Sequence, residues 1–94
     1  MKKKNIYEMV QILKGTFTNE EYKKGFNSIK DYLSKYEIKE VEELGKKRLA
    51  YEVKKNKEGY YIIFTIKANQ NDILEIERYC KINEDILKFI VVRK

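Results

Sequence analysis

The stretch that most constrains this chain is the segment 41–68, which reads VEELGKKRLAYEVKKNKEGYYIIFTIKA. Two arms rich in apolar and β-branched residues flank a polar break that ends in Gly59, a pattern typical of a β-hairpin with a longer loop. Successive side chains of a strand point to opposite faces. The second arm therefore carries one face of Tyr60, Ile62, Phe64 and Ile66 and another of Tyr61, Ile63 and Thr65. Because both faces carry large apolar residues, this strand lies between two layers or exposes a face that meets a partner.

The rest of the chain predicts two helices and two further strands. Thr18 followed by Glu21 forms a capping box that opens the first helix. Asn69 or Asn71 caps the second helix, and Gly45 is expected to mark a bulge or bend in the second strand. The expected strands are 6–13, 38–53, 60–67 and 86–92; the helical apolar stripes are Tyr22, Phe26, Ile29, Leu33 and Tyr36, on about five turns, and then Ile73, Ile76 and Cys80.

This order of elements, β-α-β-β-α-β, predicts an α+β fold of the ferredoxin-like, split βαβ type. Two helices are expected on one face of a four-stranded antiparallel sheet, within one domain that spans residues 1–94. The first and third strands are central in this fold, and the fourth pairs antiparallel with the first. In the last strand, Leu87, Phe89 and Val91 are expected on one face and Ile86, Ile90 and Val92 on the other.

Composition excludes several kinds of chemistry. The chain has no His, one Cys and only two serines, Ser28 and Ser34, so a Ser-His-Asp or Cys-His nucleophile cannot be built within it. A zinc site lacks ligands for the same reason. The four glycines are isolated, so there is no glycine-rich phosphate loop. We expect no cofactor, no metal, no enzymatic activity, no signal peptide and no membrane-spanning segment. A lone Cys80 fits a reducing compartment.

The net charge of +6 favours a polyanionic partner, and nucleic acid is the usual one. Antiparallel pairing of the first and last strands brings the two chain ends to one edge of the sheet. Five cations then converge there, and Lys and Arg are the residues that neutralise phosphates. They are Lys2, Lys3, Lys4, Arg93 and Lys94. Further basic clusters are Lys46, Lys47 and Arg48 beside Gly45, and Lys54, Lys55 and Lys57 in the hairpin loop.

Several motifs along the chain resemble one known family. They are Glu42-Glu43-Leu44-Gly45, Lys47-Arg48-Leu49-Ala50-Tyr51 and Gly59-Tyr60, with Tyr7-Glu8, Asn83 and Val91-Val92 in the same order. This set is similar to the signature of the bacterial-type small-subunit ribosomal protein numbered six, and it covers nearly the whole chain. One departure is Gln11, on the strand face that the family turns toward its helices, where an apolar or aromatic residue is expected. We interpret Gln11 as a structural polar residue with a local hydrogen bond.

The resemblance implies a structural constituent of the small ribosomal subunit in the cytoplasm, or in an organellar ribosome. Members of that family form a heterodimer with the eighteenth small-subunit protein and, together with it, bind the central domain of the small-subunit ribosomal RNA. The residues expected to contact RNA are Lys2, Lys3, Lys4, Lys46, Lys47, Arg48, Arg93 and Lys94. Those expected to contact the partner protein are Tyr61, Ile63, Arg48, Lys54 and Lys55.

Two other functions are weighed against this one. An acylphosphatase-like enzyme of the same fold needs an anion-cradling loop after the first strand and a nearby Arg, whereas this chain offers only Lys14-Gly15-Thr16. A small-molecule-binding regulatory domain that dimerises through its open sheet face is compatible with the pattern. A tight homodimer with a ligand pocket at the seam would distinguish that domain from a ribosomal protein.

Overall fold

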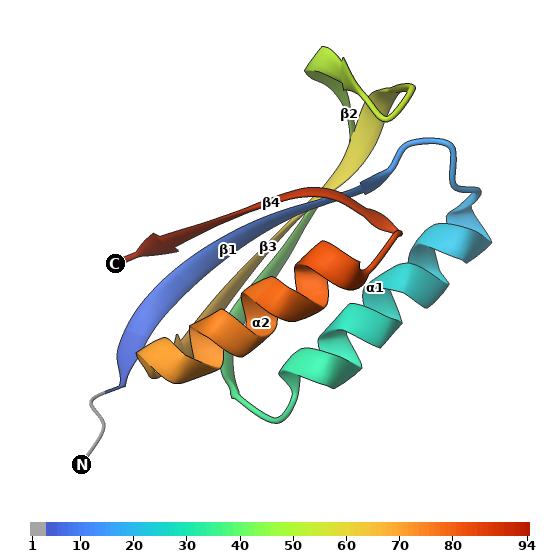
Figure 1. The fold of residues 1–94 in the computed structure, drawn as a ribbon. Coiled ribbons are helices and arrows are strands. Elements are labelled where there is room, and N and C mark those ends of the chain that lie inside the picture. The colour runs from blue at the N-terminus through green and yellow to red at the C-terminus, as the bar shows by residue number, and fades with distance from the viewer. Residues whose placement is uncertain (1–3) are drawn as a thin grey trace.

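Six elements follow one another in the computed structural model, which describes residues 4–94. They are β1 (Asn5–Lys14), α1 (Asn19–Leu33), β2 (Glu37–Val53), β3 (Asn56–Ala68), α2 (Gln70–Ile82) and β4 (Ile86–Arg93). The strands form one sheet in the order β2-β3-β1-β4, and every neighbouring pair is antiparallel. Both helices cover the same face of the sheet (Figure 1). The predicted split βαβ order and the central β1 and β3 are therefore confirmed.

Both helices begin where the sequence predicts. The Thr18 hydroxyl accepts from the Glu21 backbone N–H at 3.2 Å, and the Glu21 carboxylate accepts from the Thr18 N–H at 2.8 Å. Asn69, rather than Asn71, caps α2 through the equivalent reciprocal pair with Asp72. These boxes satisfy backbone donors that the first helical turn leaves free. The first helix is one turn shorter than expected, because Ser34 ends it and leaves Tyr36 in the following turn.

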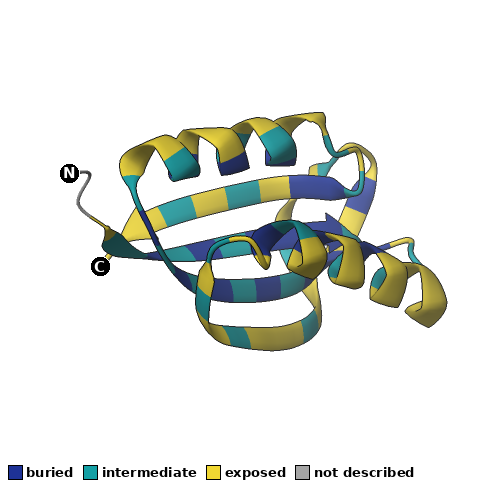
Figure 2. Cartoon of the chain, turned by 90° about the horizontal axis from the view of Figure 1, so that it is seen from below, coloured by how far each residue is buried: buried dark blue, intermediate teal, exposed yellow. Residues whose placement is uncertain are grey.

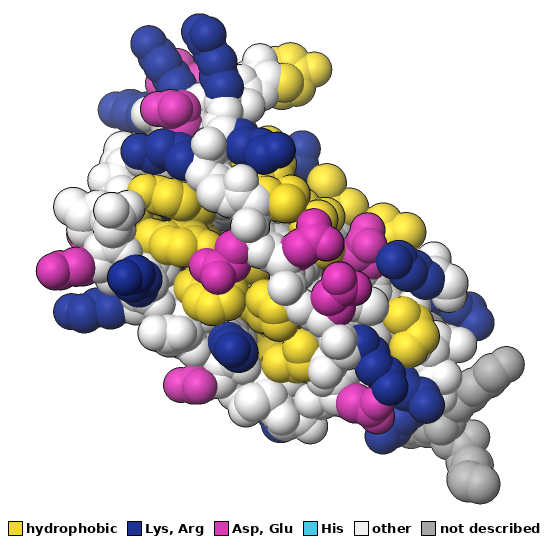
Figure 3. Space-filling view, turned by 180° about the vertical axis from the view of Figure 1, so that it is seen from behind, with side chains coloured by type: hydrophobic (Ala, Val, Ile, Leu, Met, Phe, Trp, Pro, Cys, Tyr) yellow, Lys and Arg dark blue, Asp and Glu magenta, His cyan; other side chains and the backbone are white. Residues whose placement is uncertain are grey.

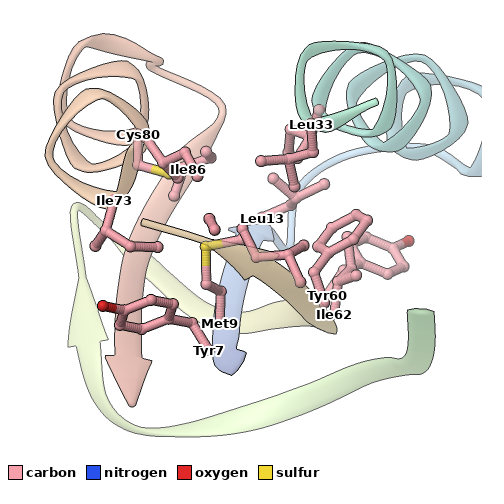
Figure 4. Packing of buried hydrophobic residues seen from close by; sticks show 14 residues of the cluster. Tyr7, Met9, Leu13, Leu33, Tyr60, Ile62, Ile73, Cys80 and Ile86 are labelled. Carbon is pink, nitrogen blue, oxygen red and sulfur yellow. The ribbon is translucent and has the colours of Figure 1, made fainter. Parts of the chain in front are cut away.

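The core lies between the helices and the sheet. Figure 2 shows the helices exposed on their outer sides and covered toward the strands. Leu13, Leu33 and Ile62 are fully buried there, and Met9 and Cys80 are within 2% of full burial (Figure 4). Side chains of this size contribute on the order of 1.5–3 kcal/mol each when removed from water, before conformational entropy is counted. The face of β1 that carries Tyr7, Met9 and Leu13 is thus the helix side, as predicted.

Gln11 is buried in this core, at 1% exposure. Its Nε2 donates to the Cys80 Sγ at 3.4 Å, a bond that joins β1 to α2 across 69 positions rather than the local bond expected. The Gln11 Oε1 has no hydrogen-bond partner among the described residues. The prediction of a structural role agrees with this placement, but the prediction of a local partner is wrong.

Two further expectations are corrected. The hairpin turn consists of two residues, Lys54 and Lys55, because β3 begins at Asn56 rather than at Tyr60. β4 contains a bulge. Lys88 pairs with Ile12 and Ile86 pairs with Leu13, so Leu87 is an extra residue between them. As a result Ile86 joins the core cluster on the side of Phe89 and Val91, and Leu87 does not. A single extra residue reverses the alternation beyond it.

Candidate interaction surfaces

The face of the sheet opposite the helices is open and apolar at its centre. Val10 on β1 is paired with Ile63 on β3 and with Ile90 on β4, so these three side chains form a row across the sheet. Tyr61 lies next to this row on β3 and pairs with Ile12. Ile63 and Tyr61 are partly buried, while Ile90 keeps 45% of its surface exposed. The sequence-predicted pair Tyr61 and Ile63 thus lies side by side on a surface that the chain's own helices leave uncovered.

Carboxylates border this apolar row. Glu42 on β2 pairs with Ile63. Glu40 on β2 and Glu8 on β1 both pair with Thr65, which follows Ile63 on the same face of β3. The same alternation that exposes Ile63 therefore directs these three acids to the open face. Glu43 follows Glu42 directly, so its side chain is expected on the opposite face of β2. The structure confirms that separation, because the Glu43 carboxylate accepts from the Tyr22 hydroxyl at 2.7 Å on the helix side.

The Tyr22–Glu43 contact ties α1 to β2 beside an aromatic stack. The ring of Tyr22 lies 4.4 Å from that of Tyr60 between centroids, and the Lys46 ammonium lies 5.4 Å from the Tyr60 centroid. Burial, and secondarily the hydrogen bond to Glu43, raise the pKa of Tyr22 well above its usual value of 10.0. The phenol is therefore neutral at physiological pH, and the cluster joins helix to strand rather than supplying an acid or base.

The chain ends meet as predicted. Tyr7 pairs with Arg93, and the Lys94 backbone N–H donates to the Ile6 carbonyl at 2.9 Å. The two cations part, however: Arg93 donates to the Asn5 Oδ1 at 3.0 Å, whereas the Lys94 ammonium lies 3.1 Å from the Glu8 carboxylate on the open face. Lys4 is exposed at the same end, and Lys2 and Lys3 lie outside the described residues.

Most of the net positive charge lies at the opposite end of the molecule. Between positions 46 and 58, six cations and two acids leave a net charge of +4, out of +6 for the whole chain. Figure 3 shows Lys and Arg side chains gathered over this end, where the β2–β3 hairpin projects past the helices. Lys46 and Arg48 alternate with Lys47, so that predicted cluster is divided between the two faces of the hairpin. Lys54 and Lys55 occupy its tip.

One exposed aromatic residue was missed from sequence. Tyr51 lies within the expected strand 38–53, yet 80% of its surface is exposed. The β2 arm departs from regular pairing between Arg48 and Val53, which oppose Glu58 and Asn56, so β2 carries three extra residues and arches outward. Bulges of this kind redirect side chains. The sequence signal was the length mismatch between the two hairpin arms.

Cys80, a residue type that can act as a nucleophile, is buried in the core. Burial raises the pKa of the Cys80 thiol from 9.0 to about 11, opposed by the hydrogen bond from Gln11, so the thiol is protonated and enclosed. Across residues 4–94, no group of three or more metal-ligating side chains is placed to hold an ion. None of the helices described is long and apolar enough to cross a membrane.

Comparison with known proteins identifies the family. The sequence model described as Ribosomal protein S6 matches residues 6–93, which is nearly the whole chain. The chain belongs to the ribosomal protein S6 family. Membership in a family of ribosomal proteins confirms the family resemblance and the expectation that this S6 protein is not an enzyme.

Individual relatives agree with this assignment. The chain is 44% identical over 89 residues to small ribosomal subunit protein bS6 of Helicobacter pylori strain Shi470, covering 93% of this chain and 63% of that protein. It is 43% identical over 91 residues to bS6 of a Sulfurovum species, covering 95% of this chain and 72% of that one. The chain thus spans less than two thirds of the Helicobacter protein.

A solved relative confirms the fold. The crystal structure of 30S ribosomal protein S6 from Thermotoga maritima superimposes with a TM-score of 0.88, at 26% sequence identity. The match covers 98% of this chain and 89% of that one. The ferredoxin-like arrangement of this S6 protein is therefore shared across large sequence divergence.

Proposed function

We propose that this S6 protein is a single-domain structural constituent of the small subunit of a cytoplasmic ribosome. In this proposal it binds the central domain of small-subunit ribosomal RNA together with the eighteenth small-subunit protein. The observation that supports the proposal most directly is the open sheet face, where Tyr61, Ile63 and Ile90 form an apolar strip that the helices do not cover. An apolar patch on a folded domain of this size marks a contact with another macromolecule.

The partner protein is the occupant we assign to this face. A nucleic-acid partner would meet the carboxylates Glu8, Glu40 and Glu42 at its border, and acids repel phosphates. A protein that presents an apolar centre and basic rim complements both features. Arg48, Lys54 and Lys55 on the hairpin would extend the contact beyond the sheet, toward an acidic segment of the same partner.

RNA contact is assigned to the positive ends of the molecule. Lys4, Arg93 and Lys94 mark one end, and Lys46, Lys47 and Arg48 begin the hairpin at the other. All six side chains are exposed, so they can reach phosphates without leaving a buried ion pair. Binding of this kind releases counterions and weakens steeply as salt is added. Lys2 and Lys3 belong to the same proposed contact, on sequence grounds alone.

The test is a pair of matched substitutions. Ile63→Asp places a charge at the centre of the proposed protein contact, whereas Ile82→Asp makes the same change at a residue of α2 that is 75% exposed. Ile63→Asp should weaken binding to the eighteenth protein by about 2 kcal/mol or more, roughly 30-fold, in calorimetric titration. Ile82→Asp should bind as the unmodified chain does.

Gel-shift titrations complete the test. The partner protein should strengthen binding to the central-domain RNA, and added salt should weaken it. If the chain has no affinity for that RNA, with or without the partner, the proposed function is wrong. A tight homodimer abolished by Ile63→Asp would instead support a dimerising regulatory domain.

A further inference from the structure

A pocket lies at the chain-end corner of the molecule, away from the open sheet face. It has a volume of about 660 Å³ and is formed by the start of β1, the first turns of α2 and the end of β4. Tyr7, Ile73 and Val91 provide an apolar floor. Figure 1 shows the start of β1 beside the first turn of α2, with β4 ending on the same side of the molecule. Its volume falls within the range of about 300–1,000 Å³ that is usual for small-molecule and cofactor sites.

Tyr7 brings a hydroxyl group to the lining of this pocket. The Tyr7 side chain as a whole is only 8% exposed and lines the pocket, but its hydroxyl is not among the buried, unpartnered polar atoms of residues 4–94, which are the Gln11 Oε1 and the Asn56 Oδ1. Figure 4 shows Tyr7 beside Ile73 at the margin of the core, with the hydroxyl directed away from the other labelled residues. A hydroxyl can both donate and accept a hydrogen bond, so the Tyr7 hydroxyl offers a partner to a polar ligand atom in the pocket.

The remaining lining is unusually rich in carboxamides. Four of them surround the floor, and each offers both donors and an acceptor. They belong to Asn5, Asn69, Gln70 and Asn71. The oxygens of Asn5 and Asn69 are engaged by Arg93 and by the Asp72 N–H, which leaves their NH₂ groups free among the bonds that the described residues make. Carboxamides are the side chains that read base edges, with adenine the preferred match.

Positive charge stands at the mouth of the pocket. Arg93 lines it and spends one N–H on Asn5, out of the five donors of a guanidinium. Glu77 is the one acid among the described residues that line the pocket. An apolar floor, carboxamide walls and a cation at the rim match a nucleoside monophosphate, whose parts are a flat base, a polar edge and a phosphate.

We propose that this pocket binds an unpaired nucleotide of RNA, with adenosine preferred. The base lies over Ile73 and Val91, its edge bonds with the Tyr7 hydroxyl and the carboxamides, and its phosphate meets Arg93. This inference rests on the proposed RNA-binding function and adds to it a site that recognises a base rather than only the backbone. A duplex cannot enter, because its bases are stacked and paired.

The experiment uses the full chain labelled with ¹⁵N. Adenosine monophosphate should shift the backbone amides of 69–74 and 91–93, and a short single-stranded oligoadenylate should do so at lower concentration than the free nucleotide. Uridine monophosphate and an RNA duplex should shift them less. Shifts confined to the hairpin at 46–58, or equal shifts with the duplex, would overturn the proposal.

Three substitutions give the matched comparison. Tyr7→Phe removes only the hydroxyl and Asn71→Ala removes one exposed carboxamide; each should weaken oligoadenylate binding by about fivefold, the worth of one hydrogen bond. Neither should change the salt dependence, since neither removes a charge. Asn27→Ala removes an exposed carboxamide from α1, outside the pocket, and should have no effect. Equal affinity of all three variants and the unmodified chain would contradict the inference.

Failure of the inference can be separated from failure of the proposed function. If the unmodified chain and its partner bind the central-domain RNA and all pocket variants bind equally well, the pocket does not read a nucleotide but the ribosomal role stands. If the unmodified chain does not bind that RNA at all, the proposed function fails as well. If the partner protein shifts the pocket amides and adenosine monophosphate does not, the pocket is a protein contact.

Discussion

Gly25 and Gly59 differ in whether their surroundings leave space for a larger side chain. A Cβ added to Gly25, in the middle of α1, would meet Leu13 and Phe17 at 3.6 Å, which is ordinary packing distance. A Cβ added to Gly59 would lie 2.4 Å from the Ile12 Cγ2 and 3.1 Å from the Leu13 carbonyl. Only the second site therefore requires glycine, through the close approach of β3 to β1.

Gly25→Ala should stabilise the protein by about 0.5–1 kcal/mol, because alanine loses less conformational entropy in a helix and the methyl group fits the space. Urea denaturation followed by circular dichroism measures the change in the free energy of unfolding. Gly59→Ala is the comparison and should destabilise by about 1–3 kcal/mol, since backbone and Ile12 must shift. A destabilised Gly25→Ala variant would show that α1 packs more tightly than the structure indicates.

The raised pKa of Cys80 predicts that the free energy of unfolding decreases at alkaline pH. The folded state raises the pKa of its thiol to about 11 from 9.0, so the folded protein binds the proton more tightly than the unfolded chain. The contribution of the Cys80 thiol to the free energy of unfolding is complete below about pH 9 and is lost as the pH rises toward about 11. Tyr22 and Tyr36, whose pKa values are also raised by burial, add losses at higher pH.

The measurement is the free energy of unfolding at several pH values from 7 to 11 for the unmodified chain and for Cys80→Ala. The variant should start less stable, because it leaves a small cavity beside Gln11, and should lose less stability above pH 9. Parallel curves for the two proteins would mean that the thiol does not titrate differently in the folded state.

At the scale of elements, the tip of the β2–β3 hairpin carries backbone strain. Lys54 and Lys55 have φ values of 47° and 66°, and a two-residue turn between right-twisted strands favours such positive values. Lysine adopts them at a cost, whereas Asn-Gly suits them best. Gly45 also has a positive φ, of 82°, at the β2 bulge, with open space around its missing Cβ.

Replacing the turn by Asn-Gly, with Lys54→Asn and Lys55→Gly together, should stabilise the protein by about 1 kcal/mol in thermal or urea unfolding. Gly45→Ala is the reverse case. The added methyl group meets no atom, so the expected decrease of about 1 kcal/mol in the free energy of unfolding comes from backbone strain alone. If the double substitution left stability unchanged and Gly45→Ala were neutral, positive φ would carry no cost in this hairpin.

At the scale of the whole molecule, charge and apolar surface are separated. The molecule measures 43 × 25 × 22 Å, and a net charge of +4 lies in the hairpin segment at one end. The proposed roles divide this hairpin: Lys46 and Lys47 near its base are assigned to RNA, and Lys54 and Lys55 at its tip to the partner. Two double substitutions that each remove two positive charges can therefore be compared directly.

Lys46→Gln with Lys47→Gln should reduce the salt dependence of RNA binding, lowering the slope of log affinity against log salt by about 1–2. Lys54→Gln with Lys55→Gln should leave that slope unchanged and weaken binding to the eighteenth protein. Filter binding across a salt series and calorimetry give the two quantities. If both pairs lowered the slope equally, the whole hairpin would be an RNA contact.

Much of this architecture follows from neighbouring residues. Thr18 and Glu21 define the start of α1, and Asn69 and Asp72 that of α2, because each cap needs only residues three apart. The alternation that separates Tyr61 from Ile62 needs only the two-residue period of a strand. The meeting of the two chain ends follows from topology alone, since the first and fourth strands pair in this fold.

Other features of the structure depend on how segments distant in sequence pack against one another. The Leu87 bulge, the arch that exposes Tyr51 and the contact of Gln11 with Cys80 each depend on how two distant segments fit together. The chain-end pocket is of the same kind, since Asn5, Asn69 and Arg93 are remote in sequence. The local period of the sequence predicts which way a side chain points. A bulge in a strand or a cavity between three elements depends instead on the packing of surfaces that meet only in the folded state.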